Sequence, residues 1–190
     1  MQSIFQHGQA EQTLNKSRFI AVAESCVDER AVMLLLRGLA QAHSHAHHLA
    51  FAYRLKNPEG QGCLVRSHDA GEPSGTAGRP ILQYIEGFDL VNACVAVVRY
   101  YGGINLGTGG LARAYGSTAK MALDAAQLGP YVEMRQLRLV VEYAQLDGVV
   151  RDVGKLGGQV LDKGFGERVT VVVSVPVVDV AGIQQKYQRR

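Results

Sequence analysis

Two glycine-rich segments, each followed by a helical apolar pattern, constrain the fold of this chain more than any other feature. The first spans residues 69–78 and precedes apolar positions that end at Gly87, with Pro80 expected at the first helical position. The second spans residues 102–110 and follows an almost wholly apolar strand at 93–98, which is expected to be buried on both faces. Strands that lead through glycine into helices indicate a mixed α and β architecture.

Weaker patterns place further elements before the first glycine-rich segment. Strands are expected at 18–24, 48–56 and 62–67, the last two as a hairpin with a turn at 57–60. Asp28 is expected to cap a helix, because its side chain can accept from free backbone N–H groups and apolar residues follow at helical spacing.

An interruption at Gly129 and Pro130 predicts a domain boundary. Residues 1–129 are expected to form one domain and residues 130–190 a second, smaller one. The smaller part is predicted as strand, helix, strand, strand and helix, which is most of a ferredoxin-like fold. With 47% hydrophobic and 19% charged residues the chain can bury a core, and the fold class expected for both domains is α+β.

The net charge and the cysteines indicate which partners and which cellular compartment the protein is expected to have. The net charge of +3 includes no run of Lys or Arg, so charge alone is weak support for nucleic-acid binding. Cys26, Cys63 and Cys94 show no C-x-x-C pair and no metal-ligand spacing, which favours a reducing compartment. Neither a signal peptide nor an apolar run of about 20 residues is evident, so a cytoplasmic protein without a membrane partner is expected.

The glycine-rich segments are the strongest candidate binding sites. Glycine lets backbone N–H groups approach an anion closely, and a helix that starts there adds unpaired donors and about half a positive charge. The nucleotide-binding pattern G-x-x-x-x-G-K-[ST] is absent, and the second segment lacks G-x-G-x-x-G. The residues expected to bind nucleic acid or another anion are Glu72, Thr76, Gly78, Arg79, Arg99, Tyr100, Gly102, Gly103, Gly107, Gly109, Arg113 and Lys120.

These residues also have a purely structural interpretation, which the sequence leaves open. The glycines can supply positive φ at tight turns. Arg99 can pair with a carboxylate such as Glu72, while Tyr100 and Tyr101 cover the core. The basic residues of the helix after the second segment can line an ordinary solvated face.

A cluster of histidines and two acidic residues suggest other chemistry. The alternate histidines between residues 43 and 47 would face one way in an extended segment, as metal ligands could, but no Cys or Glu spacing completes a ligand set. His48 could act as a base and Asp69 with Glu72 as an acid/base pair, yet no Ser or Cys lies in a nucleophile elbow. Binding is therefore favoured over catalysis, and neither a metal nor a cofactor is expected.

Several blocks of the sequence together resemble the YigZ/IMPACT family over about residues 15–127. The blocks are Lys16-Ser17-Arg18-Phe19-Ile20, Ala46-His47-His48 with Ala52-Tyr53, Asp69-Ala70-Gly71-Glu72-Pro73-Ser74-Gly75-Thr76-Ala77-Gly78-Arg79-Pro80, and Arg99-Tyr100-Tyr101-Gly102-Gly103-Ile104-Asn105-Leu106-Gly107-Thr108-Gly109-Gly110-Leu111. There are two departures. Ala70 stands where the family often has an acidic residue, and the chain stops in a helix at Arg190 where related proteins tend to continue into a final strand, so the small sheet is expected to lack one edge strand.

The resemblance implies an N-terminal domain like the second domain of a small-subunit ribosomal protein, and a C-terminal domain similar to a part of an elongation factor. It also implies a role in translation, which eukaryotic relatives regulate through protein partners. We therefore expect a non-catalytic protein that engages RNA or a ribosome-associated factor through the glycine-rich segments and a basic face. Two alternatives stay open, namely a protein-interaction module that binds no nucleic acid and an enzyme acting on a small phosphorylated metabolite.

Overall fold

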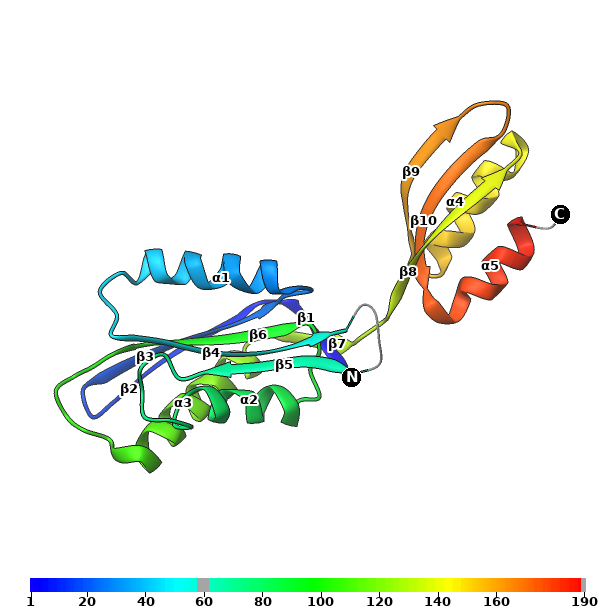
Figure 1. Cartoon of the computed structure of the whole chain (residues 1–190). Helices are drawn as coiled ribbons and strands as arrows, with labels where there is room; N and C mark the ends of the chain where they lie inside the picture. Colours follow the sequence, from blue (N-terminus) through cyan, green and yellow to red (C-terminus); the bar gives the residue numbers. More distant parts are fainter. Residues whose placement is uncertain (58–61, 189–190) are drawn as a thin grey trace. The chain divides into compact units, whose positions relative to one another are not determined.

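In a computed structural model that describes residues 1–57 and 62–188, the chain divides into two compact units, Met1–Tyr131 and Val132–Arg190 (Figure 1). The division lies two residues after the boundary predicted between residues 129 and 130. Each unit has its own sheet and its own buried core. The turn predicted at 57–60 falls mostly outside the described residues. Within the described part, no helix is long and apolar enough to cross a membrane.

A five-stranded antiparallel sheet forms the centre of the first unit. In spatial order its strands are β2 (Gly8–Leu14), β3 (Ser17–Ser25), β6 (Ala93–Tyr100), β4 (His48–Lys56) and β5 (Cys63–His68). β6 lies in the middle, and all of its residues except the last are buried, as its apolar sequence predicts. The four strands predicted for this unit are confirmed.

Three strands of this unit were not predicted. β2 forms one edge of the large sheet, and β1 (Gln2–Gln6) pairs with β7 (Gln127–Pro130) in a separate two-stranded sheet. These segments are rich in Gln and hold few β-branched residues, so their sequence signal is weak. β7 includes Gly129 and Pro130, which were expected to break the preceding helix and to mark the domain boundary.

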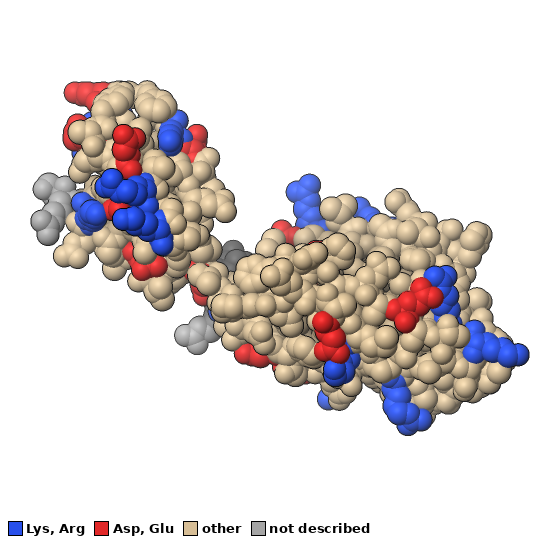
Figure 2. All heavy atoms as spheres, turned by 180° about the vertical axis from the view of Figure 1, so that it is seen from behind, with Lys and Arg blue, Asp and Glu red and all other residues tan. Residues whose placement is uncertain are grey.

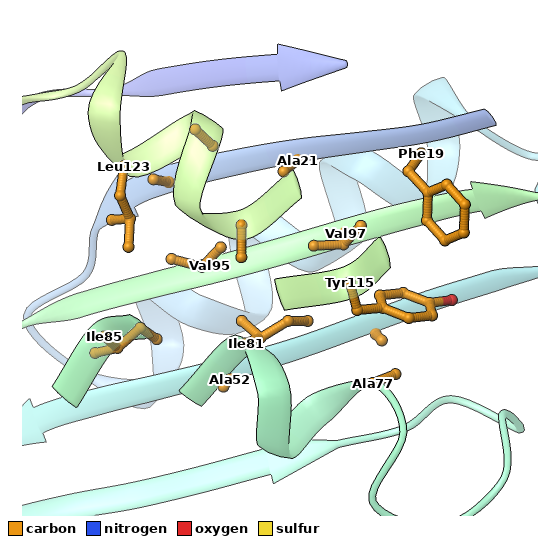
Figure 3. Close-up of a cluster of buried hydrophobic side chains, with 14 of the residues drawn as sticks. Phe19, Ala21, Ala52, Ala77, Ile81, Ile85, Val95, Val97, Tyr115 and Leu123 are labelled. Carbon is orange, nitrogen blue, oxygen red and sulfur yellow. The ribbon is translucent and has the colours of Figure 1, made fainter. Parts of the chain in front are cut away.

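Helices cover both faces of the large sheet (Figure 1). α1 (Glu29–Ala42) packs on one face, whereas α2 (Gly78–Gly87) and α3 (Gly107–Asp124) pack on the other. Figure 3 shows part of the core that lies between the large sheet and the helices α2 and α3. There the rings of Phe19 and Tyr115 meet edge to face, with their centroids 5.3 Å apart.

The helix starts agree with the sequence in one case and differ in two. Asp28 caps α1 as predicted, since its Oδ1 accepts a hydrogen bond from the N–H of Ala31 at 2.7 Å. α2 begins at Gly78, so Pro80 is its third residue and not its first. α3 already includes residues 107–110, which the sequence analysis assigned to the second glycine-rich segment.

The second unit confirms the predicted order of strand, helix, strand, strand and helix. Its elements are β8 (Met134–Val141), a 3-10 turn (Tyr143–Gln145), α4 (Leu146–Lys155), β9 (Gln159–Phe165), β10 (Val169–Pro176), a second 3-10 turn (Val177–Asp179) and α5 (Val180–Tyr187). β10 lies between β8 and β9 and is antiparallel to both. Alternate residues of β8 and β10 are buried with α4 and α5 in one apolar core, in the manner of a ferredoxin-like fold.

Candidate anion-binding site

A pocket of about 450 Å³ opens in the first unit where β6 ends and α3 begins. It is lined by the start of β4, the first glycine-rich segment, the end of β6 and the start of α3. The side chains that matter for its chemistry are His47, His48, Glu72, Arg99, Tyr101 and Thr108. Sheet topology explains why they meet, because β4 and β6 are neighbours and their register places His48 opposite Arg99.

A buried ion pair forms part of the pocket wall. Nη1 of Arg99 donates to Oε1 of Glu72 at 2.6 Å, and the hydroxyl of Tyr115 donates to the same oxygen at 2.7 Å. Burial, together with this hydrogen bond, raises the pKa of Tyr115 well above its usual range, so the hydroxyl keeps the proton that it donates. Glu72, which the sequence placed among the expected anion contacts, therefore pairs with Arg99 and neutralises it.

Arg99 keeps one donor without a partner. Its Nη2 donates to Oγ of Ser17 at 3.3 Å, but its Nε is buried and has no hydrogen-bond partner among the described residues. The guanidinium lies between the rings of Phe19 and Tyr101, at 5.5 and 5.2 Å from their centroids. Since buried donors in folded proteins nearly always have a partner, this unsatisfied Nε is an unusual feature of the residues around the pocket.

The start of α3 supplies further unpaired donors. Leu106 precedes Gly107 and has no side-chain atom that can accept a hydrogen bond, and the first turn carries no acidic side chain. The leading N–H groups of this 18-residue helix have no partner within the helix, and the helix dipole adds about half a positive charge there. Nη1 of the exposed Arg113 lies 3.5 Å from the position that a Cβ on Gly109 would take, so its guanidinium is beside this first turn.

The start of α2 differs, because the protein's own Asp69 satisfies it. Oδ1 of Asp69 accepts from the N–H groups of Ala77 at 3.0 Å and Gly78 at 2.8 Å, and Oδ2 accepts from that of Gly75 at 2.8 Å. Burial alone would raise the pKa of Asp69, but these hydrogen bonds outweigh it and the pKa is lowered. The N–H of Gly78 thus has an internal partner in Asp69, and the next residue, Arg79, is exposed outside the pocket lining.

Other predicted contacts also have internal partners. The hydroxyl and the N–H of Thr76 both donate to the carbonyl oxygen of Pro73, at 2.6 and 3.1 Å. The N–H of Gly102 donates to Oγ of Ser17 at 3.2 Å, and a Cβ on Gly102 would lie only 2.0 Å from the carbonyl oxygen of Lys16. Gly102 is therefore glycine because two backbone segments approach closely there.

The rest of the predicted set divides between the pocket and its surroundings. The hydroxyl of Tyr100 forms a hydrogen bond with Nδ1 of His43 at 2.9 Å, and Nζ of Lys120 pairs with Oδ2 of Asp124 at 2.6 Å. Gly103 has a φ of +86°, a conformation that suits glycine, and lies outside the pocket lining. The predicted residues that line the pocket are Glu72, Arg99 and Gly107.

Two histidines that were left out of the predicted anion site line the pocket, and the backbone fixes where each carries its proton. Nδ1 of His48 donates to the carbonyl oxygen of Ala70 at 2.9 Å, which leaves Nε2 as an acceptor in the neutral ring. The N–H of Tyr101 donates to Nδ1 of His47 at 3.1 Å, so His47 carries its proton on Nε2. In the described ranges, no group of three or more His, Cys, Asp and Glu residues is arranged to hold a metal ion.

Basic side chains are more dispersed on the first unit than the expected basic face requires. On the side shown in Figure 2, its Lys and Arg side chains are spread apart from one another, and some of them lie beside acidic side chains. Some also have acidic partners, since Arg18 pairs with Glu11 at 2.6 Å and Arg54 pairs with Asp89 at 3.3 Å. The positive character of the pocket is therefore local, and it comes from the start of α3 and from Arg113 beside it.

Comparison with known families and proteins divides the chain into the same two parts. Residues 15–123 match the Impact N-terminal domain, and residues 139–186 match a Domain of unknown function (DUF1949). The chain is 33% identical over 173 residues to IMPACT family member YigZ of Escherichia coli (strain K12), a match that covers 91% of this chain and 84% of that protein. It is 36% identical over 168 residues to an IMPACT family member of Haemophilus influenzae, which covers 87% and 80%.

One solved structure has a similar fold over most of the chain. It is described as the crystal structure of a hypothetical protein and matches with a TM-score of 0.73 at 30% sequence identity. The match covers 97% of this chain and 89% of that chain.

Proposed function

The chain belongs to the IMPACT family, and from the geometry of its pocket we propose that it is a binding protein that holds RNA where α3 begins. One observation carries this proposal, the presence of an uncapped helix start beside a buried arginine, Arg99, whose Nε lacks a partner. The helix start offers hydrogen-bond donors and positive potential to a phosphate, and Nε of Arg99 is a further donor beside it. The family resemblance adds translation as the expected setting, in which RNA is abundant.

The pocket offers contacts to a nucleotide base as well as to a phosphate. Tyr101 is 39% exposed and lines the pocket, and exposed aromatic rings stack on the bases of single strands. The hydroxyl of Thr108 in the pocket lining can donate to a phosphate oxygen, and so can the guanidinium of Arg113, which lies outside the lining but beside the same helical turn. Such a small set of donors suits one or two phosphates of a single strand better than a long duplex.

Fluorescence anisotropy with a labelled single-stranded RNA tests this proposal. Thr108→Glu puts a carboxylate in the first turn of α3, where it repels phosphate, and we expect the affinity to fall about tenfold or more. Thr108→Gln introduces a side chain of similar size without charge and should keep most of the wild-type affinity. Equal affinities for the wild type and both variants would contradict binding at this helix start.

Salt dependence provides a second measurement of the same contacts. One or two phosphate contacts predict that log Kd rises with log salt at a slope of about 0.7 to 1.4. Arg113→Ala should lower this slope by about 0.7, because one phosphate contact is lost. The control Arg37→Ala removes an exposed arginine of α1, on the opposite face of the sheet, and should leave the slope unchanged.

The same assays separate RNA from the two alternative ligands. If inorganic phosphate or a mononucleotide competes as well as the RNA strand does, a phosphorylated metabolite is the better assignment. If a partner captured from cell extract stays bound after nuclease treatment, and no RNA strand binds, the site recognises a protein instead.

A further inference from the structure

The pocket contains a hydrogen-bond acceptor that phosphate binding leaves unused. Nε2 of His48 has no proton in the neutral ring, because the carbonyl of Ala70 holds the proton on Nδ1. Oε1 of Glu72 lies 3.8 Å from this Nε2, which is too long for a hydrogen bond. We call these two atoms the His48–Glu72 subsite, and both residues line the pocket.

The two acceptor atoms of this subsite differ in whether they already accept hydrogen bonds. Oε1 of Glu72 already accepts hydrogen bonds from Arg99 and Tyr115. The side chain of His48 is 24% exposed, so its Nε2 can be reached from the pocket. A ligand group beside Nε2 must bring a hydrogen, because an oxygen without one would face two acceptors at once.

We propose that the His48–Glu72 subsite recognises the 2′-hydroxyl of ribose, an inference that rests on the RNA binding proposed above. This hydroxyl is the donor that distinguishes RNA from DNA, and it belongs to the sugar attached to the bound phosphate. His48 and Thr108 line the same pocket, so the sugar and the phosphate of one nucleotide can contact them together. The subsite then gives the protein selectivity for RNA over DNA of the same sequence.

Binding of three single strands with the same base sequence tests the subsite. One strand is RNA, one is 2′-deoxy, and one is 2′-O-methyl, which keeps the oxygen but has no hydrogen to donate. We expect RNA to bind about tenfold more tightly than either of the others, which corresponds to the loss of one hydrogen bond.

Variants of the histidine assign this selectivity to a residue. His48→Ala should bring the affinity ratio of RNA to DNA close to one, and His48→Gln, whose amide oxygen can accept, should restore part of it. His45→Ala removes an exposed histidine outside the pocket lining and should leave the ratio unchanged. The ratio compares strands on the same variant, so a partly unfolded preparation lowers all affinities without changing it.

The outcomes separate this inference from the proposed function. Salt-dependent binding with equal affinity for RNA and DNA would overturn the subsite and leave the phosphate site standing. Equal binding of RNA and the 2′-O-methyl strand would overturn it as well, because the donor hydrogen would then be irrelevant. Failure of all three strands to bind would remove the proposed function, and this inference with it.

Discussion

α2 and α3 both begin within glycine-rich segments, yet the N–H groups at the two helix starts differ in whether a side chain accepts from them. At α2, the single carboxylate of Asp69 accepts hydrogen bonds from the backbone of Gly75, Ala77 and Gly78. At α3, Leu106 occupies the position before the helix, and among the residues that the structure describes no side chain caps it. Glycine content therefore does not by itself make an anion site, because a helix start is open to a ligand only where no side chain of the protein occupies it.

The two segments meet at the ion pair between Glu72 and Arg99. Glu72 belongs to the first segment, and Arg99 lies just before the second. The first segment thus supplies the carboxylates that satisfy the protein's own donors, and the second leaves its donors open. Three substitutions test this division of roles.

The largest change in the free energy of unfolding is expected when the ion pair between Glu72 and Arg99 is broken. Glu72→Ala leaves the guanidinium of Arg99 buried without a counter-charge, and the free energy of unfolding should fall by about 3–5 kcal/mol. Urea unfolding followed by circular dichroism measures this. Glu86→Ala removes an exposed carboxylate of α2 and should change the value by less than about 0.5 kcal/mol. A small loss for Glu72→Ala would mean that the ion pair does not hold the segments together.

A smaller effect is expected when α2 loses its internal carboxylate. Asp69→Asn replaces charge-assisted hydrogen bonds by neutral ones, so the free energy of unfolding should fall by about 1–3 kcal/mol. RNA affinity should change little, because the proposed contacts lie at the start of α3. A variant as stable as the wild type would show that α2 does not depend on Asp69.

The same variant has a pH dependence of defined sign. The pKa of Asp69 is lowered in the folded state, so its stabilisation is fully present above the unfolded-state pKa of about 3.9 and is lost as the pH falls through the folded value. The stability difference between the wild type and Asp69→Asn should therefore be larger at pH 7 than at acidic pH below about 4. A difference that does not change with pH would argue against a charged Asp69 as the cap.

The smallest expected effect gives α3 the kind of charge that α2 already has. Thr108→Glu places a carboxylate near the positive end of the helix dipole and should raise the free energy of unfolding by about 0.3–1 kcal/mol. Its effect on stability is then opposite in sign to its effect on RNA affinity. Thermal unfolding of Thr108→Glu beside Thr108→Gln measures the gain, and a loss of stability would contradict an uncapped helix start.

Local sequence patterns were sufficient for much of the fold. The apolar run at 93–98 identified the central strand, and Asp28 identified the start of α1, because both signals lie within one turn or one strand. The order of strands and helices in the second unit was likewise predicted from apolar residues at helical spacing and from apolar residues that alternate with polar ones. β1 and β7 could not be found this way, since each forms by pairing with a segment more than a hundred residues away.

The site was harder to predict, because it depends on contacts between segments. The sequence identified Arg99 and the glycine-rich segments, but it could not show that the side chain of Asp69 reaches back to the start of α2. His48 and Tyr101 enter the pocket because β4 and β6 are paired in one particular register. Strand pairing of this kind leaves no mark on the spacing of residues within either strand.

The position of β6 has a consequence for how the first unit is made. β6 lies between β3 and β4 in the sheet, although it follows both of them in the chain. Because synthesis proceeds from the N-terminus, β3 and β4 leave the ribosome before β6, the strand that pairs with both of them, has been made. The sheet of this unit can assemble only after residue 100 has emerged, and a nascent chain halted before residue 93 would present the apolar sides of two unjoined strands to chaperones.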